Sequence, residues 1–229
     1  MIDKQPILIT GCPRSGSSMI AAAINICGAF GGEMTKRSMY SNDKIKRNIN
    51  QYYLNYFNSD LDGQNPLPDP DELNKYIKYQ NKLSNVLLDK YTEETMIKEG
   101  YIGGKWMYKD SRTCLIWPIW NEAYPKAKWV IVRRRTGDII QSCLKTAYMS
   151  KFSNQEGWLG MVHEYEKRFI EMINAGLDCK IIWPERMIDG DYRQMHELLD
   201  WLELPWKDEV IGLIDILLWK SRQKEKGGI

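Results

Sequence analysis

The stretch "ILITGCPRSGSSM", residues 7–19, decides the fold of this chain. Residues 7–10 form a short apolar run, which predicts a strand buried on both faces of a parallel sheet. A G-x-x-x-x-G loop follows from Gly11 to Gly16, and the small residues within 18–27 predict a helix packed closely on that sheet. The stretch is therefore expected to form a strand, a glycine-rich loop and a helix in succession.

The loop has the pattern of an anion-binding turn. Backbone N–H groups in such a loop, together with a helix N-terminus, form a positively polarised hollow that fits a phosphate. A nucleotide-hydrolysing P-loop carries a lysine directly after its second glycine, but Ser17 stands there in this chain. Arg14 instead places a guanidinium inside the loop. Taken alone, the pattern is also compatible with a tight strand-to-helix turn that binds nothing.

Length and charge limit the remaining possibilities. The 229 residues suit one domain, 1–229, and a net charge of +2 is too small to predict a nucleic-acid partner. The five cysteines include no C-x-x-C pair, which argues against a disulfide framework and a metal site. No run reaches the ~20 apolar residues that span a bilayer, so we expect a cytoplasmic protein without a membrane partner.

Beyond the loop, predicted strands alternate with predicted helices. Further strands are expected within residues 103–110, 127–135 and 179–183. Helices are expected at residues 113–124, 138–147, 158–175, 192–202 and 207–220. This order predicts an α/β fold: a three-layer, P-loop-like domain with a mainly parallel central sheet flanked by helices, plus a helical insertion.

Residues 36–100 interrupt the alternation with a segment rich in Asn, Tyr, Lys and Asp. Asp69, Pro70 and Glu72 are typical of a helix start, so a helix is expected from about residue 70 to residue 91. We interpret the segment as a polar helical insertion or lid that lies outside the core. Its aromatic side chains suit a sugar or another polar hydroxyl compound, but a helix packing an aromatic stripe onto the domain predicts the same spacing.

The loop sequence "PRSGSS" resembles a known family motif. It is similar to the 5'-phosphosulfate-binding loop of the sulfotransferases, commonly P-R-S-G-T-T. Those enzymes use 3'-phosphoadenosine-5'-phosphosulfate (PAPS), release adenosine 3',5'-bisphosphate (PAP) and need no metal for transfer. A transferring sulfuryl group carries less negative charge than a phosphoryl group, which is consistent with the missing lysine. The resemblance implies that the donor is bound by Pro13, Arg14, Ser15, Gly16, Ser17 and Ser18.

A second motif lies far away in the sequence. The stretch "YPKAKWVIVRRRTGDIIQS", residues 124–142, is similar to the family's 3'-phosphate-binding strand and helix. Alignment with that pattern implies that Arg134 and Ser142 bind the 3'-phosphate. An arginine at a strand end and a serine in the next helix can converge on one phosphate. Because residues 133–135 are all arginines, the register could also place Arg133 or Arg135 there.

Sulfuryl transfer to a hydroxyl requires a base that accepts the hydroxyl proton. Glu33 follows the first predicted helix, where carbohydrate- and tyrosine-modifying members of the family carry a catalytic glutamate, and Asp110 is the alternative base. Lys109, in "YKDSRTCLIWPIW", matches the lysine of the family's K-D-P segment and is expected to act with Arg14 on the bridging oxygen or the sulfuryl group. The two histidines lie in predicted amphipathic helices far from both motifs.

The resemblance therefore implies an enzyme, a PAPS-dependent sulfotransferase that modifies a hydroxyl of a small-molecule or carbohydrate acceptor. Two alternatives remain open. A P-loop kinase of small molecules shares the strand, loop and helix but requires the lysine that Ser17 replaces. A catalytically silent nucleotide-binding protein can use the same fold, because fold does not determine function.

Overall fold

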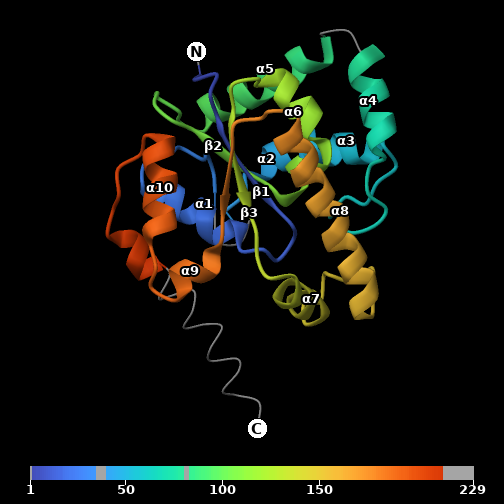
Figure 1. The fold of residues 1–229 in the computed structure, drawn as a ribbon. Coiled ribbons are helices and arrows are strands. Elements are labelled where there is room, and N and C mark those ends of the chain that lie inside the picture. Colours follow the sequence, from blue (N-terminus) through green and yellow to red (C-terminus); the bar gives the residue numbers. More distant parts are fainter. Residues whose placement is uncertain (1, 35–39, 80–82, 214–229) are drawn as a thin grey trace.

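The centre of the molecule is a four-stranded parallel sheet (Figure 1). The computed structural model describes residues 2–34, 40–79 and 83–213. The strands, in sequence order, are β1 (Ile7–Gly11), β2 (Met107–Lys109), β3 (Lys128–Val132) and β4 (Cys179–Ile182). Their spatial order is β2-β1-β3-β4, and each neighbouring pair is parallel. The predicted parallel sheet is confirmed, with β1 at its centre as expected for a strand buried on both faces.

Alternation along β1 separates two hydrophobic cores. Leu8 belongs to one core, whereas Ile7 and Ile9 belong to the other, because successive side chains of a strand point to opposite faces. The Ile7 face is covered by α1 (Ser17–Ile26), α9 (Pro184–Ile188) and α10 (Arg193–Leu202). The Leu8 face is covered by helices that include α6 (Trp117–Ala123), α7 (Thr136–Leu144) and α8 (Gln155–Asn174).

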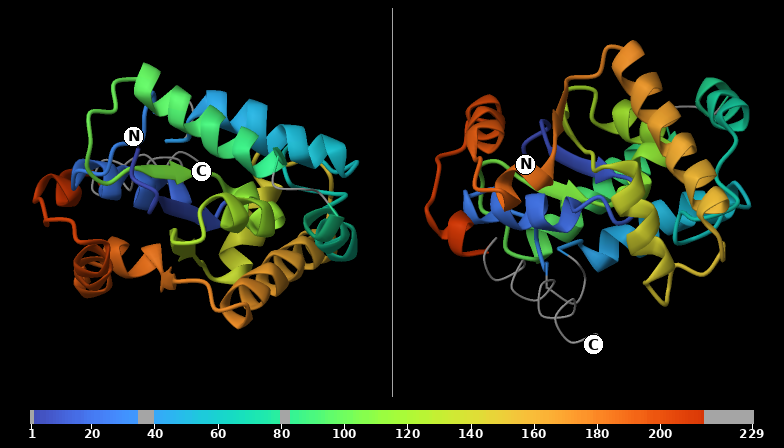
Figure 2. Two further views of the ribbon diagram at one scale, coloured as in Figure 1. Left: turned by 90° about the horizontal axis from the view of Figure 1, so that it is seen from above. Right: turned by 60° about the horizontal axis from the view of Figure 1, so that its bottom comes forward.

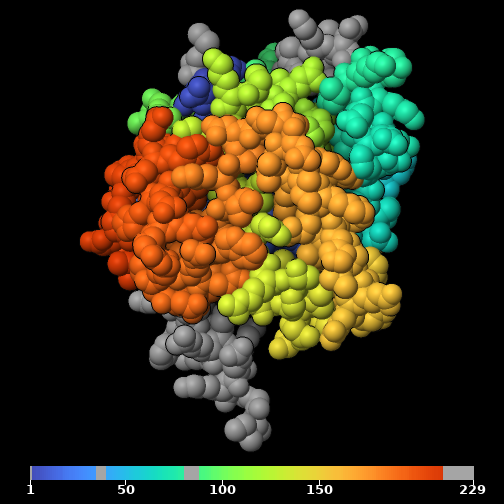
Figure 3. Space-filling model, in the orientation of Figure 1, coloured from blue at the N-terminus to red at the C-terminus, as the bar shows by residue number. Residues whose placement is uncertain are grey.

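The three layers predicted from the sequence are therefore present. Figure 1 shows α1, α9 and α10 on one side of the sheet and α6 and α8 on the other. The two views of Figure 2 give the same separation, with α10 on one flank and α8 on the other. The space-filling view shows a face covered largely by the C-terminal third of the described chain, with α8 opposite α9 and α10 (Figure 3).

The described part of segment 36–100 is largely helical. Its elements are α2 (Asp43–Ile45), the π-helical turn η1 (Lys46–Asn50), α3 (Gln51–Tyr56), α4 (Pro70–Tyr79) and α5 (Leu83–Lys98). The helix expected over residues 70–91 corresponds to α4 and the first part of α5, and residues 80–82 lie outside the description. Asp69 Oδ1 accepts a hydrogen bond from the Asp71 N–H at 2.9 Å, as expected for a helix start.

The interpretation of this segment as lying outside the core is wrong. Ile45, Leu54 and Met96 are fully buried and belong to the core on the Leu8 face of the sheet. Asn50 is also fully buried, and its side chain bonds the Trp120 indole N–H at 2.9 Å and the Thr113 hydroxyl at 3.2 Å. The polar composition concealed this role, because these buried apolar residues are scattered among polar and charged neighbours in the sequence.

Several helices outside segment 36–100 begin or end at residues that differ slightly from the predicted ones. The segment predicted as one helix at residues 113–124 is a 3-10 helix, η2 (Ser111–Ile116), followed by α6. Helix α8 begins earlier than expected because the Asn154 side chain accepts the Gly157 N–H at 2.9 Å and caps it. Of the helix predicted at 207–220, residues 209–213 are helical, and residues 214–220 lie outside the description. Within the described residues, no helix has the length and hydrophobicity required to cross a membrane.

Candidate active site

The loop between β1 and α1 has the conformation of an anion-binding turn. Arg14 and Gly16 both adopt left-handed backbone angles, with φ of 71° and 92°. Gly11 cannot be replaced without movement, since a Cβ there would lie 2.5 Å from the Val132 carbonyl oxygen. Gly16 caps α1 without a side-chain hydrogen bond, so the first N–H groups of the helix are left for another acceptor. These groups carry the positive end of the helix dipole.

A cleft of about 560 Å³ opens beside this loop. Ligands of parallel α/β sheets usually bind outside the carboxyl ends of the strands, and the cleft lies at that edge. Its lining comes from the loop and start of α1, the ends of β2 and β3, and segment 36–100. The charged and hydroxyl-bearing side chains of the lining include Arg14, Ser18, Lys46, Asp62, Lys109 and Arg134.

Arg14 and Arg134 bring the two sequence motifs together. Arg14 Nε donates a hydrogen bond to the Ser142 hydroxyl at 2.9 Å, and its NH1 donates to the Tyr148 hydroxyl at 3.3 Å. Arg134 NH1 donates to the Arg14 carbonyl at 3.2 Å. The strand end after β3 and the first turns of α7 thus contact the glycine loop directly. Two guanidinium groups line one side of the cleft as a result.

The three consecutive arginines point in different directions. Arg133 forms an ion pair with Glu166, in which its Nε lies 3.1 Å from a carboxylate oxygen, and stacks on Trp183 at 5.1 Å. Arg135 is exposed. Of the three, Arg134 is the one that lines the cleft. The geometry therefore favours Arg134 in the register that the sequence left open.

Lys109 is buried at the end of β2, beside the start of α1. Its ammonium donates a hydrogen bond to the Ser18 hydroxyl at 3.2 Å. Burial lowers the pKa of Lys109 to about 8, because the charged form loses hydration and the attraction of Asp110 compensates only in part. An anion in the cleft would favour the charged form, so Lys109 is suited to respond to a phosphate or sulfate.

Asp110, the alternative base, is held in a buried ion pair. Its side chain is 2% exposed. Its Oδ1 accepts from Arg112 Nε at 2.8 Å and its Oδ2 from Arg112 NH2 at 2.7 Å, while the Tyr108 hydroxyl donates at 3.1 Å. Burial acts to raise the pKa of Asp110, but the charge and hydrogen bonds of Arg112 outweigh it and keep the pKa below its ordinary value. Asp110 does not line the cleft, so the geometry disfavours it as a base.

Glu33 also lies outside the lining of the cleft. Its side chain is 67% exposed and pairs with the Lys44 ammonium at 3.1 Å. Its backbone N–H donates to the buried carboxylate of Glu99 at 2.7 Å, and Lys44 also binds Glu99 at 2.9 Å. The structure thus places Glu33 in an ion cluster with Lys44 and Glu99 at the end of α5.

The other residues predicted for the loop differ in orientation. Pro13, Ser17 and Ser18 line the cleft with Gly16. Ser15 does not line the cleft. Its side chain is buried without a hydrogen-bond partner, and its backbone N–H donates to the Cys12 carbonyl at 3.0 Å. A Cβ on Gly11 would lie 2.6 Å from this hydroxyl, so the side chain faces β1.

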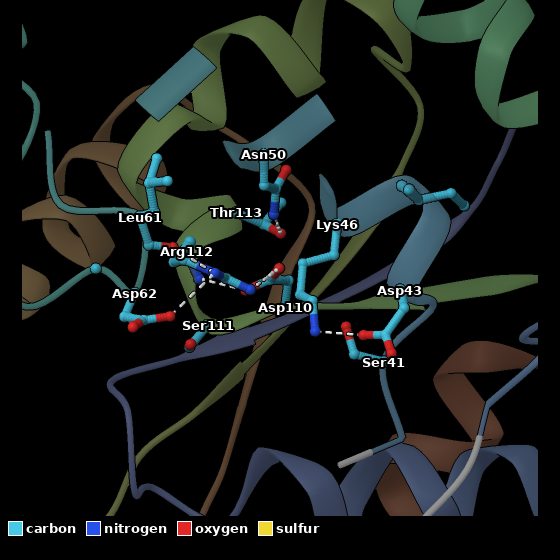
Figure 4. Close-up of polar contacts among 12 residues, drawn as sticks. Ser41, Asp43, Lys46, Asn50, Leu61, Asp62, Asp110, Ser111, Arg112 and Thr113 are labelled. Carbon is cyan, nitrogen blue, oxygen red and sulfur yellow. Dashed lines mark hydrogen bonds and ion pairs between the residues drawn. The ribbon is translucent and has the colours of Figure 1, made fainter. Parts of the chain in front are cut away.

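Several lining residues had no signal in the sequence. Lys46, Gln51 and Asp62 belong to segment 36–100, which matches no motif, yet they line the cleft together with the loop. Figure 4 shows Lys46 and Asp62 near the Asp110–Arg112 pair. Among the described residues, no group of three or more His, Cys, Asp or Glu side chains is arranged to hold a metal ion.

Fold and site together define an α/β protein with an anion-binding glycine loop at the ends of its parallel strands. The model of the sulfotransferase family matches residues 6–208, and the chain therefore belongs to the sulfotransferase family. Family and fold together support sulfuryl transfer as its general activity. A search of curated protein sequences finds no match.

Solved structures that align with this chain include two mycobacterial sulfotransferases. The sulfotransferase STF9 from Mycobacterium avium aligns over 94% of this chain and 68% of its own, at 12% identity and a TM-score of 0.54. The sulfotransferase STF1 from Mycobacterium tuberculosis H37Rv aligns over 94% of this chain and 71% of its own, at 13% identity and a TM-score of 0.49. At this identity the likeness to STF9 concerns the fold.

Proposed function

We propose that this protein transfers a sulfuryl group from PAPS to a hydroxyl group of a small-molecule or carbohydrate acceptor. The observation that carries the proposal is the meeting of two sequence motifs at one cleft, where Arg14 bonds Ser142 and Arg134 bonds Arg14. A P-loop kinase would require the lysine that Ser17 replaces.

The residues present fit a nucleotide with phosphate groups at both ends of its ribose. The uncapped N-terminus of α1 offers N–H groups, and three buried or half-buried cations, Arg14, Lys109 and Arg134, line the same cleft. Charge-assisted hydrogen bonds from such donors are the strongest available to a bound anion. In contrast, a net charge of +2 gives the whole surface little attraction for anions, so the affinity must arise locally.

We assign the roles from the resemblance and from the positions around the cleft. Gly16, Ser17 and Ser18 present the loop and helix N–H groups to the 5'-phosphosulfate, and Arg14 adds its charge. Arg134 and Ser142 bind the 3'-phosphate. Pro13 and Ser15 shape the turn. PAPS supplies an activated sulfuryl group, and Lys109 stabilises negative charge that develops on the leaving oxygen.

The acceptor side of the cleft is lined by polar groups of segment 36–100. Lys46, Gln51 and Asp62 offer a cation, an amide and a carboxylate. Such groups match the hydroxyls of a sugar or another polar compound by hydrogen bonding, and they disfavour an entirely apolar acceptor because it would displace their water without replacing its hydrogen bonds.

Calorimetric titration with PAP in EDTA tests the nucleotide site, with ATP and magnesium as the comparison. Tight binding of PAP without metal supports the proposal. Binding of ATP alone would instead indicate a kinase. Radiolabelled PAPS with a panel of sugars and phenols then tests transfer, and PAP binding without any product would identify a silent nucleotide-binding protein.

A further inference from the structure

We propose that Asp62 is the base that removes the proton from the acceptor hydroxyl. Its carboxylate lines the same cleft as Lys109 and the glycine loop, on a turn that the buried side chain of Arg112 joins to the end of β2. This proposal rests on the sulfotransferase function proposed above. It replaces Glu33 and Asp110, the carboxylates selected from the sequence, with a residue of segment 36–100.

Asp62 is the carboxylate at the cleft that can accept the proton of an acceptor hydroxyl. Among the described residues that line the cleft, Asp62 carries the one carboxylate. Its side chain is 64% exposed, so an incoming hydroxyl compound can reach it. Other acids nearby are held in closer ion pairs, Asp110–Arg112, Asp43–Lys46 and Glu33–Lys44, whereas the nearest described cation to Asp62 in an ion pair is Arg112, at 4.0 Å.

The turn that carries Asp62 holds its backbone in place. Asp60 Oδ1 accepts hydrogen bonds from the backbone N–H groups of Asp62 and Gln64, each at 3.0 Å. Gly63 has a φ of 69°, and its carbonyl accepts from the buried Tyr165 hydroxyl at 2.8 Å. An aspartate that bonds backbone groups ahead of it in this way stabilises a turn. The position of Asp62 is therefore determined by the packed core beneath it.

Arg112 connects this turn to the strand that bears Lys109. Its NH1 donates to the Leu61 carbonyl, while its Nε and NH2 bind Asp110 on the other side (Figure 4). The distance from NH1 to Asp62 Oδ1 is 4.0 Å, beyond hydrogen-bond range. Asp110 neutralises the Arg112 guanidinium. Arg112 therefore helps to position the turn that carries Asp62 without forming a close ion pair with the Asp62 carboxylate. Its oxygens remain able to accept a proton.

The chemical step balances with these groups. The acceptor oxygen forms a bond to sulfur while its proton passes to a carboxylate oxygen of Asp62. The bond from sulfur to the 5'-phosphate oxygen breaks, and that oxygen retains the electron pair as part of PAP. Lys109 lies beside Ser18 at the loop and offsets the charge that develops there. Asp62 then returns its proton to water.

The test compares Asp62→Asn with Glu33→Gln in the full chain, because these variants separate the two rival carboxylates. Product formation from radiolabelled PAPS is measured with pooled sugars and phenols, and PAP release is measured with water as the acceptor. A general base contributes about 10²- to 10⁴-fold, so we expect Asp62→Asn to lower kcat by about 10²-fold or more. Glu33→Gln should retain a kcat within a few-fold of the parent.

PAP affinity gives a readout that does not depend on turnover. Asp62→Asn removes a negative charge from a cleft that binds a polyanion, so PAP should bind about threefold more tightly. Glu33→Gln should leave PAP affinity unchanged because Glu33 does not line the cleft. Both side chains are exposed, so thermal unfolding midpoints close to the parent are expected and report intact folding.

The outcomes separate the two proposals. A fully active Asp62→Asn, or loss of activity in Glu33→Gln alone, overturns the role of Asp62. If the parent chain binds PAP but forms no product, the role of Asp62 is also overturned, while the nucleotide site stands. Failure of the parent chain to bind PAP contradicts the proposed function itself.

Discussion

Arg14 Nε donates a hydrogen bond to Ser142 Oγ at 2.9 Å, although 128 residues separate the two in the sequence. Arg134 adds a hydrogen bond from its NH1 to the Arg14 carbonyl at 3.2 Å. The loop after β1 and the helix after β3 therefore form one polar unit at neighbouring strand ends. A ligand with two phosphate groups that contacts either motif is placed close to the other.

Arg134→Ala tests the assignment of the 3'-phosphate. Loss of a charge-assisted hydrogen bond is expected to weaken PAP binding by about 1.5–3 kcal/mol, roughly 10- to 150-fold in affinity. Adenosine 5'-phosphate should bind nearly as before. Calorimetric titration of both nucleotides measures the difference. Arg135→Ala is the matched control, because Arg135 is exposed and does not line the cleft. Equal losses for both nucleotides would refute the assignment.

The low pKa of Lys109 predicts how PAP binding depends on pH. A bound anion raises the pKa of this buried ammonium from its value of about 8, so binding takes up protons above that pH. We expect PAP affinity to be highest below pH 8 and to fall by at most about tenfold per pH unit above it. Titration in buffers of different ionisation enthalpy measures the proton uptake. Lys109→Met should bind PAP weakly and lose this dependence; an unchanged pH profile in that variant would contradict the prediction.

The same shift predicts how stability changes with pH in the absence of ligand. The unfolded chain keeps the ordinary Lys pKa of 10.5, whereas the folded chain releases this proton near pH 8. Between these values the unfolded state binds more protons, so the contribution of Lys109 to the free energy of unfolding rises with pH and is lowest below pH 8. Urea unfolding from pH 7.5 to 10 measures it against Lys109→Met. No difference in slope between the two proteins would show that Lys109 is not the source.

Arg112→Met is expected to destabilise the fold strongly. It leaves the buried Asp110 carboxylate without its cation and releases the Leu61 carbonyl, so the free energy of unfolding should fall by about 3–5 kcal/mol. Chemical denaturation provides the value. The double variant Arg112→Met with Asp110→Asn should recover part of the loss, because the unpaired charge is removed. A single variant as stable as the parent would mean that the ion pair adds nothing to stability.

Gly11→Ala tests the close approach of β1 to β3. The added methyl group would lie 2.5 Å from the Val132 carbonyl oxygen and 2.6 Å from Ser15 Oγ, so the loop or the strand must move. We expect a loss of about 1–3 kcal/mol in unfolding free energy and weaker PAP binding. Gly137→Ala in α7 is the control, since its methyl group would meet no atom within 4 Å. Comparable stability of the two variants would disprove the steric argument.

The strand, loop and helix at residues 7–26 were predictable because local signals agree there. An apolar run, two glycines and a row of alanines each favour the conformation that the structure has. The parallel sheet followed from the alternation of apolar runs with helical segments. Boundaries were less certain, because capping by a single side chain such as Asn154 moves a helix start by several residues.

Segment 36–100 was misjudged for a physical reason. Composition reports the average polarity of a segment, whereas burial depends on which individual side chains meet the core after packing. Ile45, Leu54 and Met96 are buried among many polar neighbours. The same effect concealed Asp62, because an acidic residue in a polar turn has no distinguishing local pattern.

The sequence by itself determined the class of fold, the glycine loop and the family, since these depend on short contiguous patterns with strong conformational or chemical constraints. Tertiary structure alone decided which carboxylate meets the cleft. Asp110 lies next to Lys109 in sequence but is turned into a buried pair with Arg112, whereas Asp62 arrives from a distant turn. The difference arises because successive side chains of an extended chain point to opposite sides, so Lys109 and Asp110 diverge, while packing brings a turn distant in sequence to the cleft.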